Sequence, residues 1–348
     1  MAPGHGVREK RLALSVPLDG FTLPEHAELA REGERLGYSD AWSYEADGVD
    51  AFAPLAVVAM ATGLRVGTAI VNVFTRGPAT LASCAAGLAE LAPGRFCLGI
   101  GAGSQVIVEG WNGGRFQRPA TRVREMATIL RRMLAGERVV FKGETVSVDG
   151  FRLARPPAHP PAIHVAALRE GMLRVAGEVG DGVILNWLAP ADVPRCVAIV
   201  REAASRAGRD PTAVEVTARL LVHVDPPGPA SDVLARRHVA AYLNVPVYRA
   251  FHEWLGRGGA LAPMWDAWAR GDRRGAVQAI PDEVIADLII RGPMEAIRAR
   301  AREYLEAGVD TAFLSVQTAE QDPVRQRETL RAALRALAPG PVSDGRAP

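Results

Sequence analysis

The stretch LRVGTAIV (Leu64–Val71), a helical pattern from Pro78 to Leu91, and the stretch RFCLGIG (Arg95–Gly101) decide the fold of this chain. Both short stretches are mainly apolar, and the first is rich in β-branched residues, which is typical of strands buried on both faces. The helical pattern between them is long enough to cross back over a sheet. The unit therefore predicts two parallel strands joined by a right-handed crossover.

The same alternation of short apolar runs and amphipathic patterns extends along the chain in both directions. Further strands are predicted at Arg11–Pro17, Ser39–Tyr44, Ala162–Ala167, Gly182–Trp187, Val214–Val224 and Thr311–Val316. Further helices are predicted at Pro24–Leu36, Phe52–Ala61 and Pro119–Leu134, from Glu170, from near Pro190, and at Pro323–Leu337. Eight strand–helix units favour closure over an open sheet, so we expect an α/β fold, a (β/α)8 TIM barrel forming one domain over 1–348.

Two segments interrupt the alternation. Residues 136–153 alternate apolar and polar residues between turn signals, which predicts a β-hairpin insertion after the fourth strand. Residues 231–290 form a helical, aromatic-rich insertion after the seventh strand. Its part Tyr242–Trp268 is either plain helical core or a lid that covers the barrel mouth and lines an apolar substrate pocket. The ends, 1–9 and 340–348, are rich in Pro, Gly and polar residues and are expected to be loose.

Composition narrows the function. The net charge of +2 gives no reason to expect a nucleic-acid or membrane partner. The N-terminus has no apolar signal segment, and Cys84, Cys97 and Cys196 are far apart, which favours reduced, buried thiols in a cytoplasmic protein. The seven histidines lack metal-ligand spacing, so no metal site is expected.

Active sites of such barrels lie at the C-terminal ends of the strands. Glu45 ends an apolar strand and could act there as acid, base or hydrogen-bond partner, or simply be a solvated loop acid. Gly101 and Gly103 fail the dinucleotide-binding pattern because Ser104 stands where a third glycine belongs. We interpret them as a backbone that can approach a flat ring. The turn at Arg169 opens a helix whose free amides attract phosphate, although the residues alone favour a plain strand-to-helix turn.

Four ordered segments together resemble a known family. They are GTAIVNVFTRGPATLA (Gly67–Ala82), LGIGAGSQVIVEGWNG (Leu98–Gly113), GMLRVAGEVGDGVILNW (Gly171–Trp187) and AYLNVPVYRAFHEWLG (Ala241–Gly256). They resemble the bacterial luciferase-like superfamily, specifically its coenzyme F420-dependent oxidoreductases.

This resemblance implies that a deazaflavin ring lies against a bulge at the end of the third strand, with a non-proline cis peptide at or beside Ala69–Ile70. It implies that the cofactor phosphate lies on the turn Ala167–Met172, and that Asn72 reaches the polar edge of the ring. The implied cofactor-binding residues are Ala69, Ile70, Val71, Asn72, Gly101, Gly103, Ser104, Ala166, Ala167, Leu168, Arg169, Gly171, Met172 and Asn186.

The sequence also departs from that family. F420-dependent dehydrogenases commonly carry Asp-His after the second strand, where this chain has Glu45 and Ala46. Some carry an acid directly after the glycines of the fourth strand, where this chain has Ser104, with Glu109 five residues further on. We therefore predict Glu45 and Glu109 as the proton-transfer residues.

The resemblance predicts hydride transfer between F420 and a small-to-medium organic substrate. The alternatives are an FMN-dependent luciferase-like monooxygenase and a flavin-binding relative without catalysis. Relatives are often homodimers, but the sequence leaves the oligomeric state open.

Overall fold

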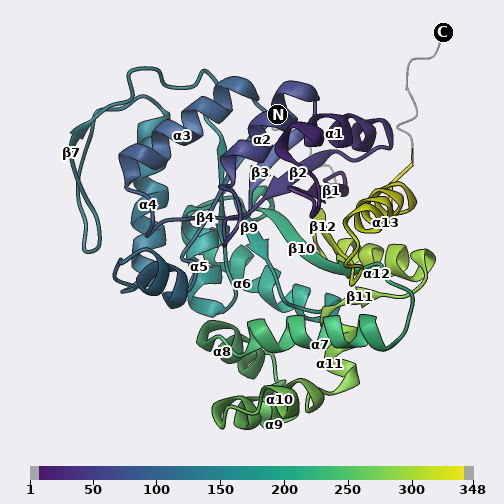
Figure 1. Ribbon diagram of the computed structural model, residues 1–348. Coiled ribbons are helices and arrows are strands. Elements are labelled where there is room, and N and C mark those ends of the chain that lie inside the picture. Colours follow the sequence, from purple (N-terminus) through teal and green to yellow (C-terminus); the bar gives the residue numbers. More distant parts are fainter. Residues whose placement is uncertain (1–7, 341–348) are drawn as a thin grey trace.

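The computed structural model describes residues 8–340, and in it eight parallel strands close into a barrel (Figure 1). In spatial order they are β1 (Arg11–Ser15), β2 (Asp40–Ser43), β3 (Arg65–Thr68), β5 (Phe96–Gly101), β8 (Ala162–Ala166), β9 (Gly182–Leu185), β10 (Glu215–His223) and β12 (Thr311–Gln317). The pairing of β12 with β1 closes the ring. The predicted TIM barrel is confirmed.

Helices surround the barrel. They are α1 (His26–Arg35), α2 (Phe52–Ala61), α3 (Pro78–Leu91), α4 (Pro119–Leu134), α5 (Glu170–Val179), α6 (Val193–Arg206), α12 (Met294–Glu306) and α13 (Pro323–Ala336). The helix predicted from Pro24 begins as a short 3-10 turn, Leu23–Glu25. Helix α12 was not predicted separately, because the aromatic insertion before it hid where the barrel pattern resumes.

The strand predicted over Leu64–Val71 is interrupted. A cis peptide bond joins Ala69 and Ile70. Beyond it the two-residue strand β4 (Val71–Asn72) continues the pairing with β5 that β3 begins. The predicted first strand also ends early, at Ser15, before a cis Val16–Pro17 bond.

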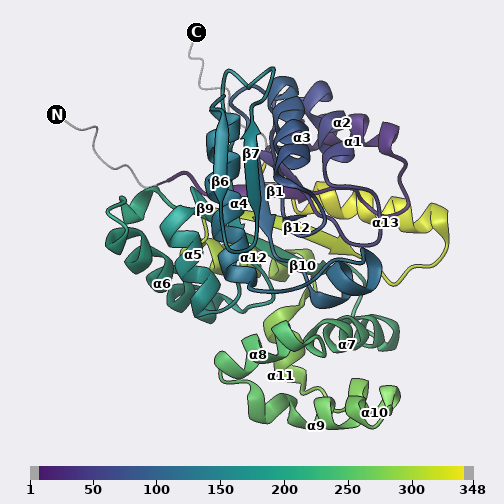
Figure 2. The same ribbon diagram turned by 90° about the vertical axis from the view of Figure 1, so that its left-hand side faces the viewer.

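Both insertions lie where the pattern placed them. The strands β6 (Val139–Lys142) and β7 (Ser147–Phe151) form an antiparallel hairpin. The helices α7 (Pro229–Leu243), α8 (Pro246–Trp254), α9 (Gly258–Ala269), α10 (Arg273–Gln278) and α11 (Asp282–Leu288) follow β10, and they form a separate layer against one end of the barrel (Figure 2). The short strand β11 (Ile290–Arg291) then pairs with the end of β10. We call these five helices the cap layer.

The barrel interior holds large rings above a buried ion network. The rings of Trp42 and Phe313 stack with centroids 5.7 Å apart. A Cβ atom on Gly67 would lie 2.4 Å from the Trp42 ring, so only glycine leaves room for that ring. At the N-terminal end of the strands, Arg65 bonds the buried carboxylates of Asp40 and Glu215.

The remaining predictions about the chain have mixed outcomes. The three cysteines are free, but only Cys97 and Cys196 are buried, while Cys84 is half-buried. Arg8 lies outside any strand, yet its guanidinium donates to the Ala213 carbonyl (2.6 Å). The other expected loose ends, residues 1–7 and 341–348, lie outside the described residues. Within 8–340 no helix is long and apolar enough to cross a bilayer.

Candidate functional site

One wall of the barrel mouth is built by the interrupted third strand. The cis bond falls at Ala69–Ile70, as the resemblance implied. The carbonyl of Ile70 accepts a hydrogen bond from the Glu45 amide (3.2 Å). A Cβ atom on Gly101 would lie 2.9 Å from Ile70 Cγ1 and 3.3 Å from Ala166 Cβ. The structure thus brings Ala69, Ile70, Gly101 and Ala166 together into a wall of small and apolar groups, which we call the bulge wall.

Asn72 carries the one buried amide of this wall. Its side chain is only 4% exposed, and its Oδ1 accepts from the Phe74 amide (2.8 Å). Its Nδ2 is buried and has no partner among the described residues. A Cβ atom on Gly103, whose φ is 66°, would lie 2.2 Å from that Nδ2. A buried donor without an acceptor costs roughly 1–3 kcal/mol, so Nδ2 suits a carbonyl oxygen supplied by a ligand.

Glu45 is held beside Asn72. Its carboxylate forms an ion pair with Arg76, and its Oε2 lies 3.5 Å from the Asn72 backbone nitrogen. The guanidinium of Arg76 also lies over the Phe52 ring, 5.6 Å from its centroid. Glu45 is therefore an oriented, half-buried group at the strand ends and not a freely solvated loop acid.

The turn predicted to hold a phosphate leads into an uncapped helix N-terminus. Helix α5 begins at Glu170, and no side chain caps its N-terminus. Its first-turn amides therefore lack intrahelical acceptors and point toward the turn. Gly171 is exposed and has open space where a Cβ would be, while Ala167 is buried beneath. Leu168, Arg169 and Met172 complete the turn around this open position.

Glu109 lies in a different environment from Glu45. It belongs to a π-helical turn, Val106–Trp111, that the sequence did not predict, and it is exposed. Its carboxylate accepts from the Gln105 side chain (2.6 Å) and the Phe116 amide (2.9 Å), and these bonds lower its pKa. Ser104 starts this turn, and its hydroxyl accepts from the Ile107 amide (3.4 Å). These bonds hold Glu109 within the turn, and its role in proton transfer stays a prediction.

Asn186 is also used within the chain. Its side-chain oxygen accepts from the Trp187 amide (2.9 Å), which braces Trp187 in a left-handed conformation with φ 56°. That conformation directs the Trp187 ring against the cap layer, where it packs on Tyr242 with centroids 4.6 Å apart. Asn186 thus helps to position an aromatic ring, and its contact with the cofactor stays a prediction.

The cap layer contributes only its first part to the mouth. Tyr242 and Tyr248 both contact the Trp187 ring. Trp265 is buried inside the layer, where its indole donates to the Leu243 carbonyl (2.9 Å). The segment Tyr242–Trp268 therefore packs on the Trp187 ring at its start and forms core of the layer further on, and its role as a lid stays a prediction.

Sequence reasoning missed a row of mainly polar side chains on β10, in the barrel wall opposite the bulge wall. Along β10 the alternate residues Glu215, Thr217, Arg219, Leu221 and His223 share one face, which begins at the buried ion network. His223 stacks on His238 of α7, with Nε2 and Nδ1 3.3 Å apart. Burial lowers the pKa of His223 to about 4 and that of His238 to about 3. The alternation in the predicted strand was the signal that could have found this face.

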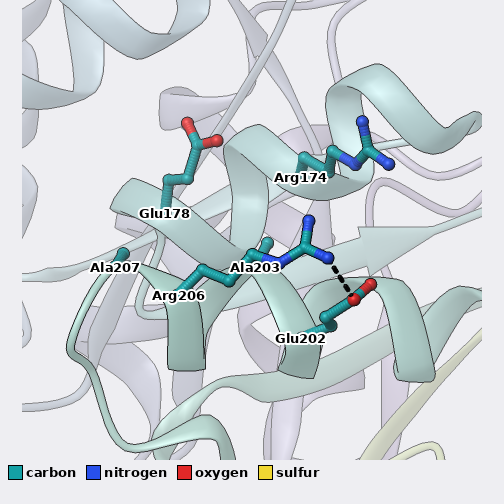
Figure 3. Close-up of a pocket in the computed structure, with 6 residues that line it drawn as sticks. All are labelled: Arg174, Glu178, Glu202, Ala203, Arg206 and Ala207. Atoms are coloured by element: carbon teal, nitrogen blue, oxygen red, sulfur yellow. Dashed lines mark hydrogen bonds and ion pairs between the residues drawn. The ribbon is translucent and has the colours of Figure 1, made fainter.

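A surface hollow elsewhere on the barrel is not a candidate (Figure 3). It lies between α5 and α6 and is lined mainly by the charged side chains of Arg174, Glu178, Glu202 and Arg206. Arg206 pairs with Glu202 one helical turn away. Exposed ion pairs of this kind contribute little to stability. The hollow lies on the outer helical wall, away from the strand ends where such barrels place their active sites. In the described part of the chain no three His, Cys, Asp or Glu side chains are placed to hold a metal ion.

Comparison with known proteins places these features in a family. The family model described as luciferase-like monooxygenase matches residues 5–311. The 5,10-methylenetetrahydromethanopterin reductase of Methanolobus tindarius is 30% identical over 287 residues, covering 81% of this chain and 87% of that protein.

Two solved structures share the fold. The coenzyme F420-dependent tetrahydromethanopterin reductase of Methanopyrus kandleri has a TM-score of 0.77 at 22% identity, covering 95% of this chain and 98% of its own. An F420-dependent secondary alcohol dehydrogenase has a TM-score of 0.73 at 18% identity, covering 94% and 98%. With a family model spanning nearly the whole barrel and the bulge wall at its mouth, this chain belongs to the luciferase-like monooxygenase family.

Proposed function

We propose that this chain is an F420-dependent oxidoreductase that transfers a hydride between the deazaflavin and a small-to-medium organic substrate. The observation that carries the proposal is the unpartnered Nδ2 of Asn72 beside the bulge wall. It offers a buried donor next to a flat, side-chain-poor surface, which is what the carbonyl edge of a flavin-like ring needs. Both similar structures named above are F420-dependent according to their descriptions.

The residues present fit such a ring. The bulge wall would lie against one face of the ring, and Val71, Gly103 and Ser104 flank the wall at the strand ends. The open turn Ala167–Met172 would hold a phosphate at the N-terminus of α5. The cofactor, when bound, supplies hydride chemistry at carbon, while the protein supplies binding and orientation.

Glu45 is the proposed proton-transfer residue. It lies at the same strand ends as Asn72, and its ion pair with Arg76 fixes the direction of its carboxylate. Position 46 is alanine and supplies no histidine, whereas Glu45 contacts the bulge wall through its backbone bond to Ile70. We propose that it accepts or returns the proton that accompanies hydride transfer.

Cofactor titration tests the proposal. Purified protein is titrated with F420 and, separately, with FMN, and binding is followed by fluorescence quenching. We expect micromolar binding of F420 and weaker binding of FMN. Micromolar FMN binding without F420 binding would refute the proposal and favour the monooxygenase alternative. Binding of either cofactor without turnover over a broad substrate panel would favour a relative without catalysis.

Two variants sharpen the test. Gly101→Val fills the space beside Ile70 and Ala166, and Asn72→Ala removes the unpartnered donor, so each should weaken F420 binding about 10-fold or more. Gly77→Ala is the matched control, because a Cβ there has no neighbour within 4 Å. If all three variants bind F420 as the wild type does, the ring does not lie on the bulge wall.

A cytoplasmic location, a homodimer and a single domain over 1–348 stay predictions from the sequence. Size-exclusion chromatography with light scattering would determine the oligomeric state.

A further inference from the structure

Arg219 is buried in the barrel wall that faces the bulge wall. It lies in the middle of β10, with Phe313 as its register partner on β12, and it is 7% exposed. In the closed ring of eight strands, β10 stands four positions from β3, which is directly across the barrel. Arg219 therefore faces the proposed cofactor site from the other side of the mouth.

The contacts of Arg219 leave its charge uncompensated. One terminal nitrogen donates to the Ser315 hydroxyl (2.9 Å), and the guanidinium lies over the Tyr44 ring, 4.2 Å from its centroid. Its Nε is buried and has no hydrogen-bond partner among residues 8–340. Among the ion pairs between described residues, none joins Arg219 to a carboxylate.

Two half-buried arginines of the interior are, by contrast, paired with acids. Arg65 bonds Asp40 and Glu215, and Arg257 pairs with Asp192 (2.9 Å) and Asp287 (3.0 Å). A buried guanidinium is costly unless an anion pairs with it, because burial removes its hydration. An arginine that the fold buries without such a partner is arranged to receive one from outside the chain.

Its surroundings determine what kind of anion fits. The positive charge of Arg219 acts on His238 and Tyr248 of the cap layer, and Tyr44 lies on the other side. His238 is neutral at pH 7, because burial lowers its pKa to about 3, so it adds no second charge. The site thus combines one fixed cation with aromatic and half-buried side chains.

We propose that Arg219 binds the carboxylate of an anionic organic substrate, whose apolar body packs between Tyr44 and the tyrosines of the cap layer. A guanidinium fork matches a carboxylate in shape and charge. This inference rests on the proposed function, since it places the substrate between the cap layer and a ring on the bulge wall. It makes Arg219 a specificity residue and not a member of the cofactor site.

The test uses benzoate as the probe and benzamide as its neutral counterpart of equal shape. Each is titrated into the purified full-length protein by calorimetry, with and without F420. We expect the wild type to bind benzoate at least about 10-fold more tightly than benzamide. Arg219→Met should remove that preference through a 10- to 100-fold loss of benzoate affinity, the range that charge-assisted hydrogen bonds support.

Two further variants keep the test decisive. Arg219→Lys retains the charge without the fork and should keep part of the preference, even if the methionine variant does not fold. Arg195→Met is the control, because Arg195 also lies on an aromatic ring, that of Trp254, but on the outer wall. Arg195→Met should leave the affinities for benzoate and benzamide unchanged.

The outcomes separate this inference from the proposed function. Wild-type protein that does not prefer benzoate, including protein that binds neither probe, overturns the inference. A loss of F420 affinity in Arg219→Met equal to the loss of benzoate affinity also overturns it, because Arg219 would then serve the cofactor. Benzoate preference without any F420 binding would instead refute the proposed function and leave the anion site standing.

Discussion

The buried ion network at the N-terminal end of the barrel supports the clearest prediction, the replacement Arg65→Met. Arg65 of β3 bonds Glu215 of β10 through two hydrogen bonds of 2.8 and 2.6 Å and Thr311 of β12 through one of 3.0 Å. It also bonds Asp40 of β2. One side chain thus ties together strands from both halves of the barrel.

The expected loss comes from what the replacement leaves behind. Methionine fills much of the volume but leaves Asp40, which is fully buried, and Glu215, which is 8% exposed, without their cation. Breaking a buried pair from one side costs about 3–5 kcal/mol, and here two carboxylates lose their partner. Glu215→Gln should cost less, about 1–2 kcal/mol, because Arg65 keeps Asp40.

The dependence on pH has a definite sign. Hydrogen bonds and charge from Arg65 hold the pKa of Glu215 below its usual value of 4.5, against the opposing effect of burial. A carboxylate with a lowered pKa stabilises the fold above its unfolded pKa and loses that contribution as the pH falls. The difference between wild type and Arg65→Met should therefore be full at pH 7 and shrink as the pH falls below 4.5.

Urea denaturation followed by circular dichroism at pH 7 and at pH 4 measures both effects. Equal m-values would show that the variants unfold the same surface. Arg65→Met within about 1 kcal/mol of wild type at pH 7 would contradict the reasoning. So would a difference that grows on acidification.

Two other predictions concern the interior. Gly67→Ala should destabilise the protein by about 1–3 kcal/mol, since the new Cβ would lie 2.4 Å from the Trp42 ring. A free energy of unfolding within roughly 0.5 kcal/mol of the wild-type value would show that the ring can shift. His252→Leu removes a buried imidazole that has no hydrogen-bond partner on either nitrogen and whose pKa burial lowers to about 3. Because the unfolded histidine takes up a proton below about pH 6.5 and the folded one does not, wild type should lose stability faster than the variant between pH 6 and 4, by up to about 1.4 kcal/mol per pH unit. If urea denaturation gives free energies of unfolding that fall equally for wild type and His252→Leu between pH 6 and 4, this reasoning is contradicted.

Much of the fold could be predicted from local pattern. The bounds of α2 and α4 and the end of α3 were predicted to the residue, and Pro78 and Pro119 mark the first turns of α3 and α4. The bulge at Ala69–Ile70 was predicted only through the family resemblance, since no periodicity signals a cis bond. The π-helical turn at Val106–Trp111 was missed because it has no distinct local pattern, and helix α12 was missed because the aromatic insertion before it hid where the barrel pattern resumes.

The candidate site, too, was predictable from the sequence only in part. Sequence alone determined that Glu45, Asn72, Gly101 and the turn at Arg169 follow strands, because in a parallel barrel every strand ends at the same rim. Only the tertiary structure decided which of these side chains stay available. It ties Glu109 and Asn186 into their own turns and leaves Asn72 Nδ2 unpartnered. It also sets Arg219 across from the bulge wall without an acid. Hydrogen-bond partners and ion pairs depend on which strands closure brings together. The strands that carry residues 72 and 219 lie on opposite sides of one ring only because β12 pairs with β1.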